Sequence, residues 1–171
     1  MIDSYYRDKL SSLHVDRSHG HPKPHKVCLL LAIIDLIRDG SITKNAFAID
    51  DSLKAAFSSH FKKLQKGNDS ENLLLPFYHL RTEGFWHFEL KPDMQEAFDE
   101  LIGNGGPGSI RQLEKYIEFA FLDEKLFQAL QSEQFRLEAS QLLLENLEDL
   151  SVQYHRWLIE IGKSEKTAKN Y

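Results

Sequence analysis

The chain has 171 residues, 42% of them hydrophobic, and a net charge of −5. This length and hydrophobic content suffice for one packed domain, which excludes disorder as the default state. The longest apolar run, residues 27–34, is far shorter than the roughly 20 residues of a membrane-spanning helix, and no signal-peptide pattern precedes it. The single cysteine, Cys28, excludes a disulfide framework, and we expect it to be a buried thiol. We therefore expect a cytoplasmic protein with no membrane partner.

Charge is divided unevenly along the chain. Residues 1–92 carry 13 Lys/Arg and 11 Asp/Glu, together with seven of the eight histidines. Residues 93–162 carry 5 Lys/Arg and 14 Asp/Glu. The overall negative charge therefore hides a first half that is suited to meet an anion such as nucleic acid.

The sequence of the first half predicts three helices, with one short strand between the second and the third. A first helix is indicated after a capping Asp3 or Ser4 by apolar residues at helical spacing, which are Tyr6, Leu10 and Leu13. A second helix begins at Pro24, ends before Gly40, and is apolar on nearly every face, which is typical of the centre of a core. Residues 41–49 predict a short strand. Residues 51–64 predict a helix capped by Asp50 or Asp51.

The second half predicts one more strand and further helices. The chain breaks at Pro76 and turns at Glu83–Gly84, and residues 85–90 then alternate as in a half-buried strand. A helix over residues 94–101 is followed by the loop GNGGPGS. Three further helices run to about Leu150, with plausible caps at Ser109, Asp123 and Ser132. The fold class is therefore α+β and mostly helical: a compact helical domain with a small antiparallel β element, winged-helix-like.

The histidines and glycines do not complete a familiar catalytic or metal pattern. Four histidines, namely His14, His19, His21 and His25, fall within twelve residues, but no cysteine or well-placed carboxylate completes a ligand set, so we expect no metal and no cofactor. The loop GNGGPGS lacks the Lys-Ser/Thr that follows the glycines of a phosphate-binding loop, which favours a flexible loop. The acidic residues of the second half are spaced for solvent-facing helix surfaces, so a catalytic carboxylate pair is not expected.

A basic segment surrounds the proline-marked start of the second helix. Its members are Arg17, His19, His21, Lys23, His25 and Lys26. Free N–H groups and the positive end of the dipole make a helix start suitable for backbone phosphates, although a solvated loop without function is an equal alternative on composition alone. Arg81 has the same two interpretations, because it could hold a phosphate or pair with Glu83.

Three stretches of the chain resemble blocks of one known family. In chain order they are PHKVCLLLAIIDLI, LLPFYHLRTEGFWHFEL and IEFAFLDEKLFQAL, and together they span roughly residues 20–145. They resemble the Pro-His-Lys block, the block from Pro-Phe to Gly-Phe/Leu-Trp, and a later helical segment of the sulfur-binding domains of HNH restriction endonucleases. Val27 stands where the first block usually has proline, and Leu75 where an aromatic residue often precedes the proline.

The resemblance implies binding of phosphorothioated double-stranded DNA, without catalysis by this domain. By match to the family's proline block, it implies a sulfur pocket made of Leu75, Pro76, Phe77 and His79. His25 and Lys26 would form a cationic rim, and the remaining DNA-binding candidates are Arg17, His19, His21, Lys23, Arg81, Thr82, Ser109 and Arg111. Sulfur is larger and less strongly hydrated than oxygen, so an apolar pocket can select for it while cations supply affinity and register.

The expected organisation is a sulfur-binding domain over residues 1–150. Residues 151–171 would form a helix and the start of a linker to a C-terminal HNH nuclease domain of a longer protein, and homo-oligomer formation is left open. Two rival functions remain: a winged-helix module that reads unmodified DNA, and a protein-interaction domain that uses the acidic residues 93–162. An intrinsic nuclease is a third and weaker rival.

Overall fold

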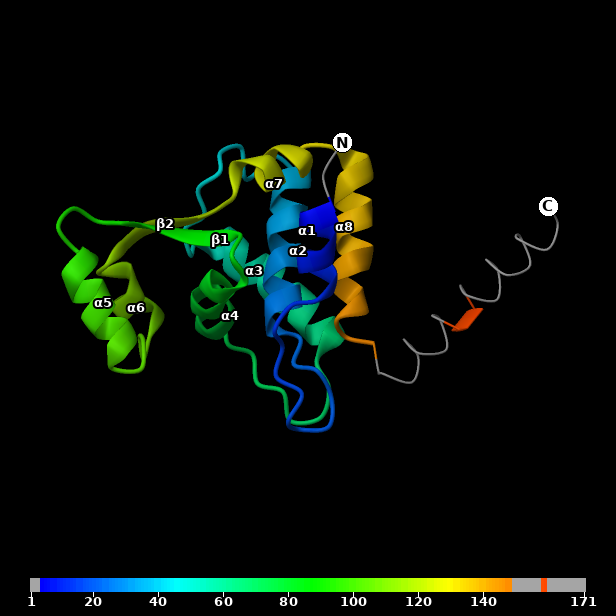
Figure 1. Cartoon of the computed structure of the whole chain (residues 1–171), viewed down its shortest axis with the longest axis horizontal. Coiled ribbons are helices and arrows are strands. Elements are labelled where there is room, and N and C mark those ends of the chain that lie inside the picture. Colours follow the sequence, from blue (N-terminus) through cyan, green and yellow to red (C-terminus); the bar gives the residue numbers. More distant parts are fainter. Residues whose placement is uncertain (1–3, 149–157, 160–171) are drawn as a thin grey trace.

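Figure 1 shows the chain in a computed structural model that describes residues 4–148 and 158–159. The fold is α+β and mostly helical, as predicted. None of the helices among these residues is long and apolar enough to cross a membrane. The elements, in chain order, are α1 (Ser4–Ser11), α2 (His25–Arg38), α3 (Asp51–Leu64), α4 (Leu74–His79), the 3-10 helix η1 (Leu80–Glu83), β1 (Trp86–Leu90), α5 (Gln95–Gly103), α6 (Ile110–Glu114), β2 (Ile117–Leu122), α7 (Glu124–Ala129) and α8 (Glu133–Glu145).

Helix α2 is the centre of the core. It packs against α3, α4 and α8, and α8 also covers α1 (Figure 1). Pro24 precedes its first residue and Gly40, with φ +83°, follows its last turn, so both predicted ends are confirmed. Cys28 is fully buried in α2, and that burial is the main reason why the pKa of its thiol is raised to about 12. The cysteine is therefore a core residue.

The small sheet pairs β1 with β2 in antiparallel register. Trp86 faces Leu122 and Phe88 faces Ala120, with an irregularity after Glu89. Strand β2 was predicted as helix, which is wrong. Pairing with β1 decides the strand: Ala120 and Leu122 alternate into the core, and Ile117 joins them because the register skips Glu118. Helices α5 and α6 lie between the two strands in the chain and sit together at the outer end of the sheet (Figure 1).

The predicted strand over residues 41–49 is reduced to one isolated bridge. Phe47 exchanges backbone hydrogen bonds of 2.7 and 2.9 Å with Ala120, and no further ladder is formed over that stretch. Short turn bonds on both sides, from the Ala46 N–H to Lys44 and from the Asp50 N–H to Ala48, fold the segment away from an extended course. The ring of Phe47 nevertheless packs on Trp86 and is buried in the core.

Helix caps decide how several elements begin. Asp50 accepts a hydrogen bond from the Leu53 N–H, and Ser109 and Ser132 cap α6 and α8 in the same way, as predicted. Asp123 precedes α7 but forms no side-chain cap. Its carboxylate instead accepts a 2.7 Å bond from the Tyr6 hydroxyl and lies 2.6 Å from His87 Nε2, which connects α1 with β1.

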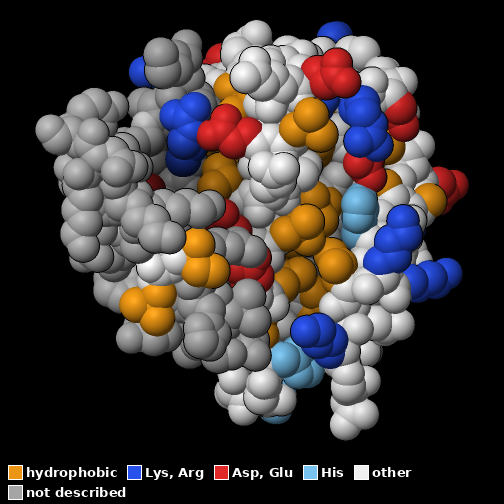
Figure 2. Space-filling view, turned by 90° about the vertical axis from the view of Figure 1, so that its right-hand side faces the viewer, with side chains coloured by type: hydrophobic (Ala, Val, Ile, Leu, Met, Phe, Trp, Pro, Cys, Tyr) orange, Lys and Arg blue, Asp and Glu red, His pale blue; other side chains and the backbone are white. Residues whose placement is uncertain are grey.

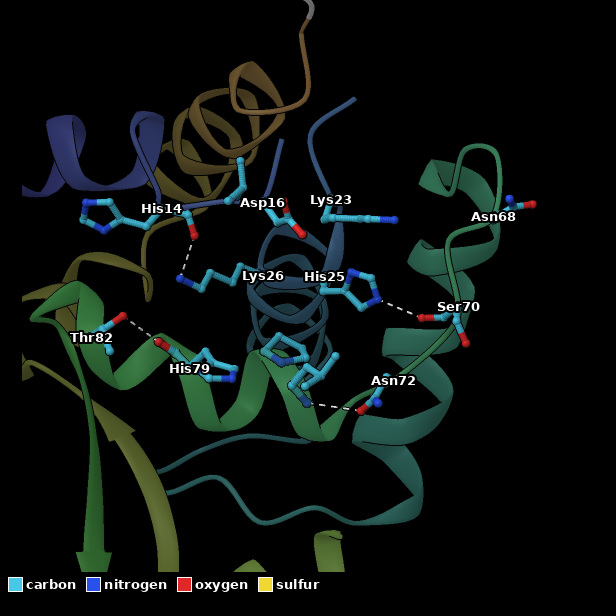
Figure 3. Close-up of a pocket in the computed structure, with 13 residues that line it drawn as sticks. His14, Asp16, Lys23, His25, Lys26, Asn68, Ser70, Asn72, His79 and Thr82 are labelled. Carbon is cyan, nitrogen blue, oxygen red and sulfur yellow. Dashed lines mark hydrogen bonds between the residues drawn. The ribbon is translucent and has the colours of Figure 1, made fainter. Parts of the chain in front are cut away.

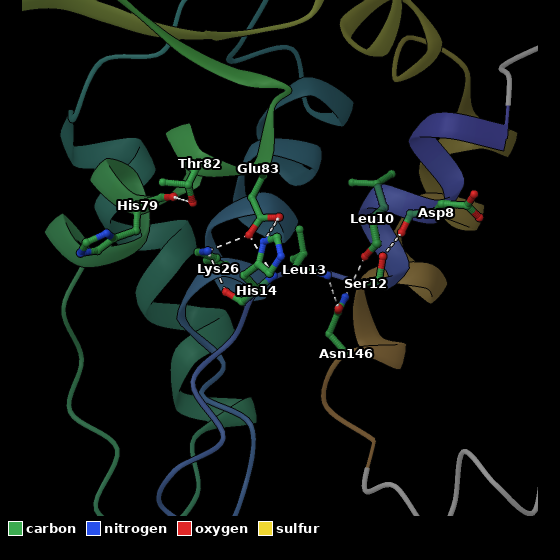
Figure 4. Close-up of polar contacts among 10 residues, drawn as sticks. All are labelled: Asp8, Leu10, Ser12, Leu13, His14, Lys26, His79, Thr82, Glu83 and Asn146. Carbon is green, nitrogen blue, oxygen red and sulfur yellow. Dashed lines mark hydrogen bonds and ion pairs between the residues drawn. The ribbon is translucent and has the colours of Figure 1, made fainter.

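Asn146, buried just after α8, fixes the chain where it leaves α1. Its Oδ1 accepts from the Leu13 N–H at 2.8 Å and its Nδ2 donates to the Leu10 carbonyl at 2.7 Å (Figure 4). Arg17 donates to the Asn146 carbonyl at 3.2 Å. These hydrogen bonds hold the start of the loop between α1 and α2 against the end of α8. The helix expected within residues 151–171 lies outside the described residues, except that residues 158–159 are helical.

Candidate functional site

Pro76 does not break the chain, as the sequence predicted, but lies in the first turn of α4. The helix begins at Leu74, and the missing N–H of Pro76 falls where a helix has no internal acceptor for it. Asn72 accepts from the Leu75 N–H at 3.2 Å and so satisfies a neighbouring donor. After α4 the chain tightens into η1 and ends in the left-handed Gly84, which leads directly into β1.

A cavity of about 520 Å³ lies between α4 and the start of α2 (Figure 3). The loop after α1 closes one side and the connection from α3 to α4 closes another. The lining residues are His14, Val15, Asp16, Lys23, His25, Lys26, Asn68, Ser70, Asn72, Leu75, Pro76, His79 and Thr82. The cavity thus joins two sequence blocks, residues 23–26 and 75–82, that lie about fifty residues apart in the chain.

The structure brings seven of the predicted site residues to this cavity. They are Lys23, His25, Lys26, Leu75, Pro76, His79 and Thr82. Leu75 is 45% exposed and Pro76 lies beside it, so together they give the cavity an apolar wall. Thr82 directs its hydroxyl to the His79 carbonyl at 2.9 Å.

Other predicted residues do not line the cavity. The fully buried ring of Phe77 packs edge-on against Trp86, whose indole N–H donates to the Phe77 carbonyl at 2.9 Å, so Phe77 is a core residue. Ser109 caps α6 and Arg111 lies in that same helix. The remaining candidates away from the cavity wall are Arg17, His19, His21 and Arg81.

Arg81 does not pair with Glu83. Its guanidinium lies over the Tyr78 ring, 4.6 Å from the centroid, and donates to the Tyr78 hydroxyl at 3.2 Å. The alternative interpretation, in which the two neighbours in sequence neutralise each other, is therefore wrong. Glu83 instead points back toward α2.

The carboxylate of Glu83 is fully buried and pairs with Lys26 (Figure 4). Lys26 Nζ donates to Glu83 Oε1 at 2.7 Å and to the His14 carbonyl at 2.7 Å. The same Oε1 accepts from the His14 N–H at 2.9 Å. A buried carboxylate would be costly alone, and Lys26, itself only 12% exposed, offsets that cost. Local sequence gave no signal for this pair, because 57 residues separate its members.

A second buried carboxylate, Asp69, pairs with Lys23. Asp69 Oδ1 accepts from Lys23 Nζ at 2.7 Å and lies 2.8 Å from His21 Nε2, and Oδ2 accepts from the Lys66 N–H at 2.8 Å. Burial by itself raises the pKa of Asp69. The hydrogen bonds from Lys23, the Lys66 backbone and His21 outweigh it and lower that pKa to about 2. Asp69 is therefore ionised at neutral pH.

Two histidines of the cavity have different surroundings. His25 Nε2 is 2.8 Å from the Ser70 carbonyl, which only accepts, so this nitrogen carries a proton and leaves Nδ1 for other contacts. Its ring also packs near Phe61. Burial lowers the pKa of His79, and the neighbouring charges of Lys26 and Arg81 lower it further. His79 is therefore mainly neutral at pH 7.

The cavity combines an apolar wall with cations that are already paired. The ammonium groups of Lys23 and Lys26 each face a buried carboxylate, and Asp16 adds a further acidic group at the edge. Within residues 4–148 and 158–159, no three histidine, cysteine or carboxylate side chains gather in a way that could hold a metal ion. The arrangement is suited to bind an anion with an apolar part through directed N–H groups and surface contact.

Comparison with known proteins adds no assignment. No protein-family model matches the chain, and no curated protein matches it. The functional assignment therefore depends on the sequence blocks and on the geometry of the cavity.

Proposed function

We propose that this chain binds double-stranded DNA that carries a phosphorothioate. The sulfur would rest against Leu75 and Pro76, with His79 beside them, and Lys23, His25 and Lys26 would meet the adjacent phosphate oxygens. The observation that supports the proposal best is that one cavity is lined by two of the three sequence blocks on which the family resemblance depends. Neither block alone would supply an apolar wall and N–H donors together.

The chemistry of the modification fits such a cavity. Replacement of a non-bridging phosphate oxygen by sulfur keeps the negative charge but gives a larger and more weakly hydrated atom. Burial against Leu75 and Pro76 therefore costs less for sulfur than for an oxyanion. The donors around the apolar wall would hold the remaining phosphate oxygens, which both kinds of backbone possess.

In this proposal the domain recognises DNA and does not cut it. It would serve a cytoplasmic, modification-dependent HNH restriction endonuclease, in which a separate domain carries the nuclease. His19, His21, Thr82 and the loop before Ser109 are the candidates for weaker contacts to the duplex. No step of the proposal requires a metal or cofactor bound to the described residues.

The proposal is tested with matched duplexes that differ at one position. One duplex is unmodified, and two carry a single phosphorothioate in its two stereochemical forms. We expect tighter binding of at least one sulfur-containing duplex, together with a clear loss on Pro76→Ala. Equal affinity for all three duplexes would contradict the proposal and would instead favour a module that binds unmodified DNA.

A protein-interaction function is the second candidate, and the surface of α8 favours it. Leu137 and Leu144 lie seven residues apart on this helix and are 64% and 41% exposed. Figure 2 looks at the side of the molecule where α8 lies in Figure 1 and shows hydrophobic side chains gathered there. This candidate predicts no salt-dependent binding to DNA of any kind, which the same binding experiment measures.

A further inference from the structure

We infer that Glu83 and Asp69 determine the specificity of the cavity by neutralising its lysines, so that charge alone cannot retain an ordinary phosphate. This inference deepens the proposed function and rests on it. Both carboxylates have no exposed side-chain surface, and each holds one cavity lysine at 2.7 Å. The two carboxylates come from different parts of the chain, Asp69 before α4 and Glu83 at the end of η1, so each lysine has its own partner.

Lys26 has one N–H donor left for a ligand in the cavity. An ammonium group has three N–H donors, and Lys26 uses two of them on Glu83 and on the His14 carbonyl. The third can make one directed hydrogen bond into the cavity. Lys26 can therefore orient a ligand through one hydrogen bond, while its positive charge is already compensated by Glu83.

Asp69 restrains Lys23 in a similar way. The lowered pKa of Asp69 means that its negative charge is present throughout the neutral range. Its other contacts, from His21 and the Lys66 N–H, hold the carboxylate where Lys23 needs it. With Asp16 also on the cavity wall, the charged side chains at the cavity do not sum to a positive site when the histidines are neutral.

Such compensation acts differently on oxygen and on sulfur. An oxyanion that enters an apolar cavity loses strong hydration and needs a charged donor to replace it. Sulfur loses less hydration and gains more from contact with Leu75 and Pro76. Withholding the free charge of Lys26 and Lys23 therefore penalises the unmodified backbone more than the phosphorothioate.

The test uses the full chain and the variant Glu83→Gln. The amide oxygen can keep the Oε1 contacts with Lys26 and His14. The amide nitrogen takes the place of Oε2, which accepts no hydrogen bond from any described residue and lies 3.4 Å from His14 Nδ1. We expect affinity for the unmodified duplex to rise roughly three- to tenfold, which is about the net contribution of one ordinary hydrogen bond. The affinity for the phosphorothioate duplex should rise less, so the ratio of phosphorothioate affinity to unmodified affinity falls.

The salt dependence gives a readout that a purely structural role would not change. The slope of log affinity for unmodified DNA against log salt should steepen by up to about 0.9 for the one lysine charge released. Asp69→Asn should change the slope in the same direction. It replaces Glu83→Gln in the test if thermal unfolding shows that Glu83→Gln is not folded. The matched control is Glu71→Gln, which removes the same charge from an exposed carboxylate bonded to Ser58.

The outcomes separate this inference from the proposed function. If the unaltered chain does not prefer sulfur, the proposed function fails and the inference fails with it. If the unaltered chain prefers sulfur but the folded variants keep the same ratio as Glu71→Gln, the inference is overturned while the proposed function stands. The inference is supported if Glu83→Gln or Asp69→Asn lowers the ratio of sulfur-duplex affinity to unmodified-duplex affinity and steepens the salt slope, while Glu71→Gln changes neither.

Discussion

The cavity and the surfaces of α5 and α8 treat their acidic residues in opposite ways. At the cavity, the side chains of Glu83 and Asp69 have no exposed surface and each is paired with a lysine. On α5 and α8, carboxylates such as Glu96, Glu100 and Glu133 are exposed on helix faces that turn toward solvent. The two groups carry the same formal charge, but only the buried pairs can shape a binding site, because water screens the exposed ones.

This contrast shows that the net charge of a segment is a poor guide to its site. The first half of the chain is weakly basic by count, and much of that basic charge is neutralised within the cavity itself. What distinguishes the cavity is that its two lysines are paired with buried carboxylates beside an apolar wall. Removal of buried partners should therefore matter far more than removal of exposed charges.

The largest effect is expected from Lys26→Met, which leaves the carboxylate of Glu83 buried without its cation. We expect a loss of about 3–5 kcal/mol in the free energy of unfolding, measured in urea. Lys62→Met, at an exposed lysine of α3, is the control and should stay within about 0.5 kcal/mol. A loss for Lys26→Met that is no greater than the control's would mean that the pair is not a buried one.

Leu29→Ala removes a fully buried side chain from α2 and should cost about 2–5 kcal/mol, through lost transfer free energy and a residual cavity. Leu137→Ala is the matched control, because the same change is made at a residue that is 64% exposed on α8. Thermal and urea unfolding of both variants compare the two helices. Similar losses would contradict the placement of α2 at the centre of the core.

The acid stability of the chain should depend on Asp69. Its folded pKa of about 2 lies below the ordinary value of 3.8, so its ionisation stabilises the fold above pH 4 and this stabilisation is lost as the pH falls from about 4 toward 2. Asp69→Asn should therefore make the free energy of unfolding less dependent on pH in this range. The exposed Asp51→Asn serves as control, and identical pH profiles for the unaltered chain and Asp69→Asn would exclude the effect.

The sequence predicted the elements whose signals are local. The apolar run with Pro24 and Gly40 at its ends gave α2, and the caps Asp50 and Ser132 gave the starts of α3 and α8. Strand β2 was missed because alternation and helix caps competed over the same residues, and only pairing with β1 decides between them.

The candidate site was predictable in part. The sequence named His25, Lys26 and Pro76 as neighbours through the family resemblance, and the cavity contains all three. It gave no indication that Glu83 and Asp69 hold the lysines, since the two pairs span 57 and 46 residues. Contacts of that range depend on how the start of α2 packs against the segment between α3 and the end of η1, which periodicity does not encode.

The most direct test of the central claim compares two affinities in one variant, Leu75→Ser. Leu75 is partly exposed, so the fold should tolerate the change, while the apolar wall of the cavity is reduced. The account predicts that affinity for a phosphorothioate duplex falls several-fold, about what a partly buried leucine contributes, while affinity for the matched unmodified duplex is nearly unchanged. Equal losses for the two duplexes, or no loss for either, would contradict an apolar sulfur site at this cavity.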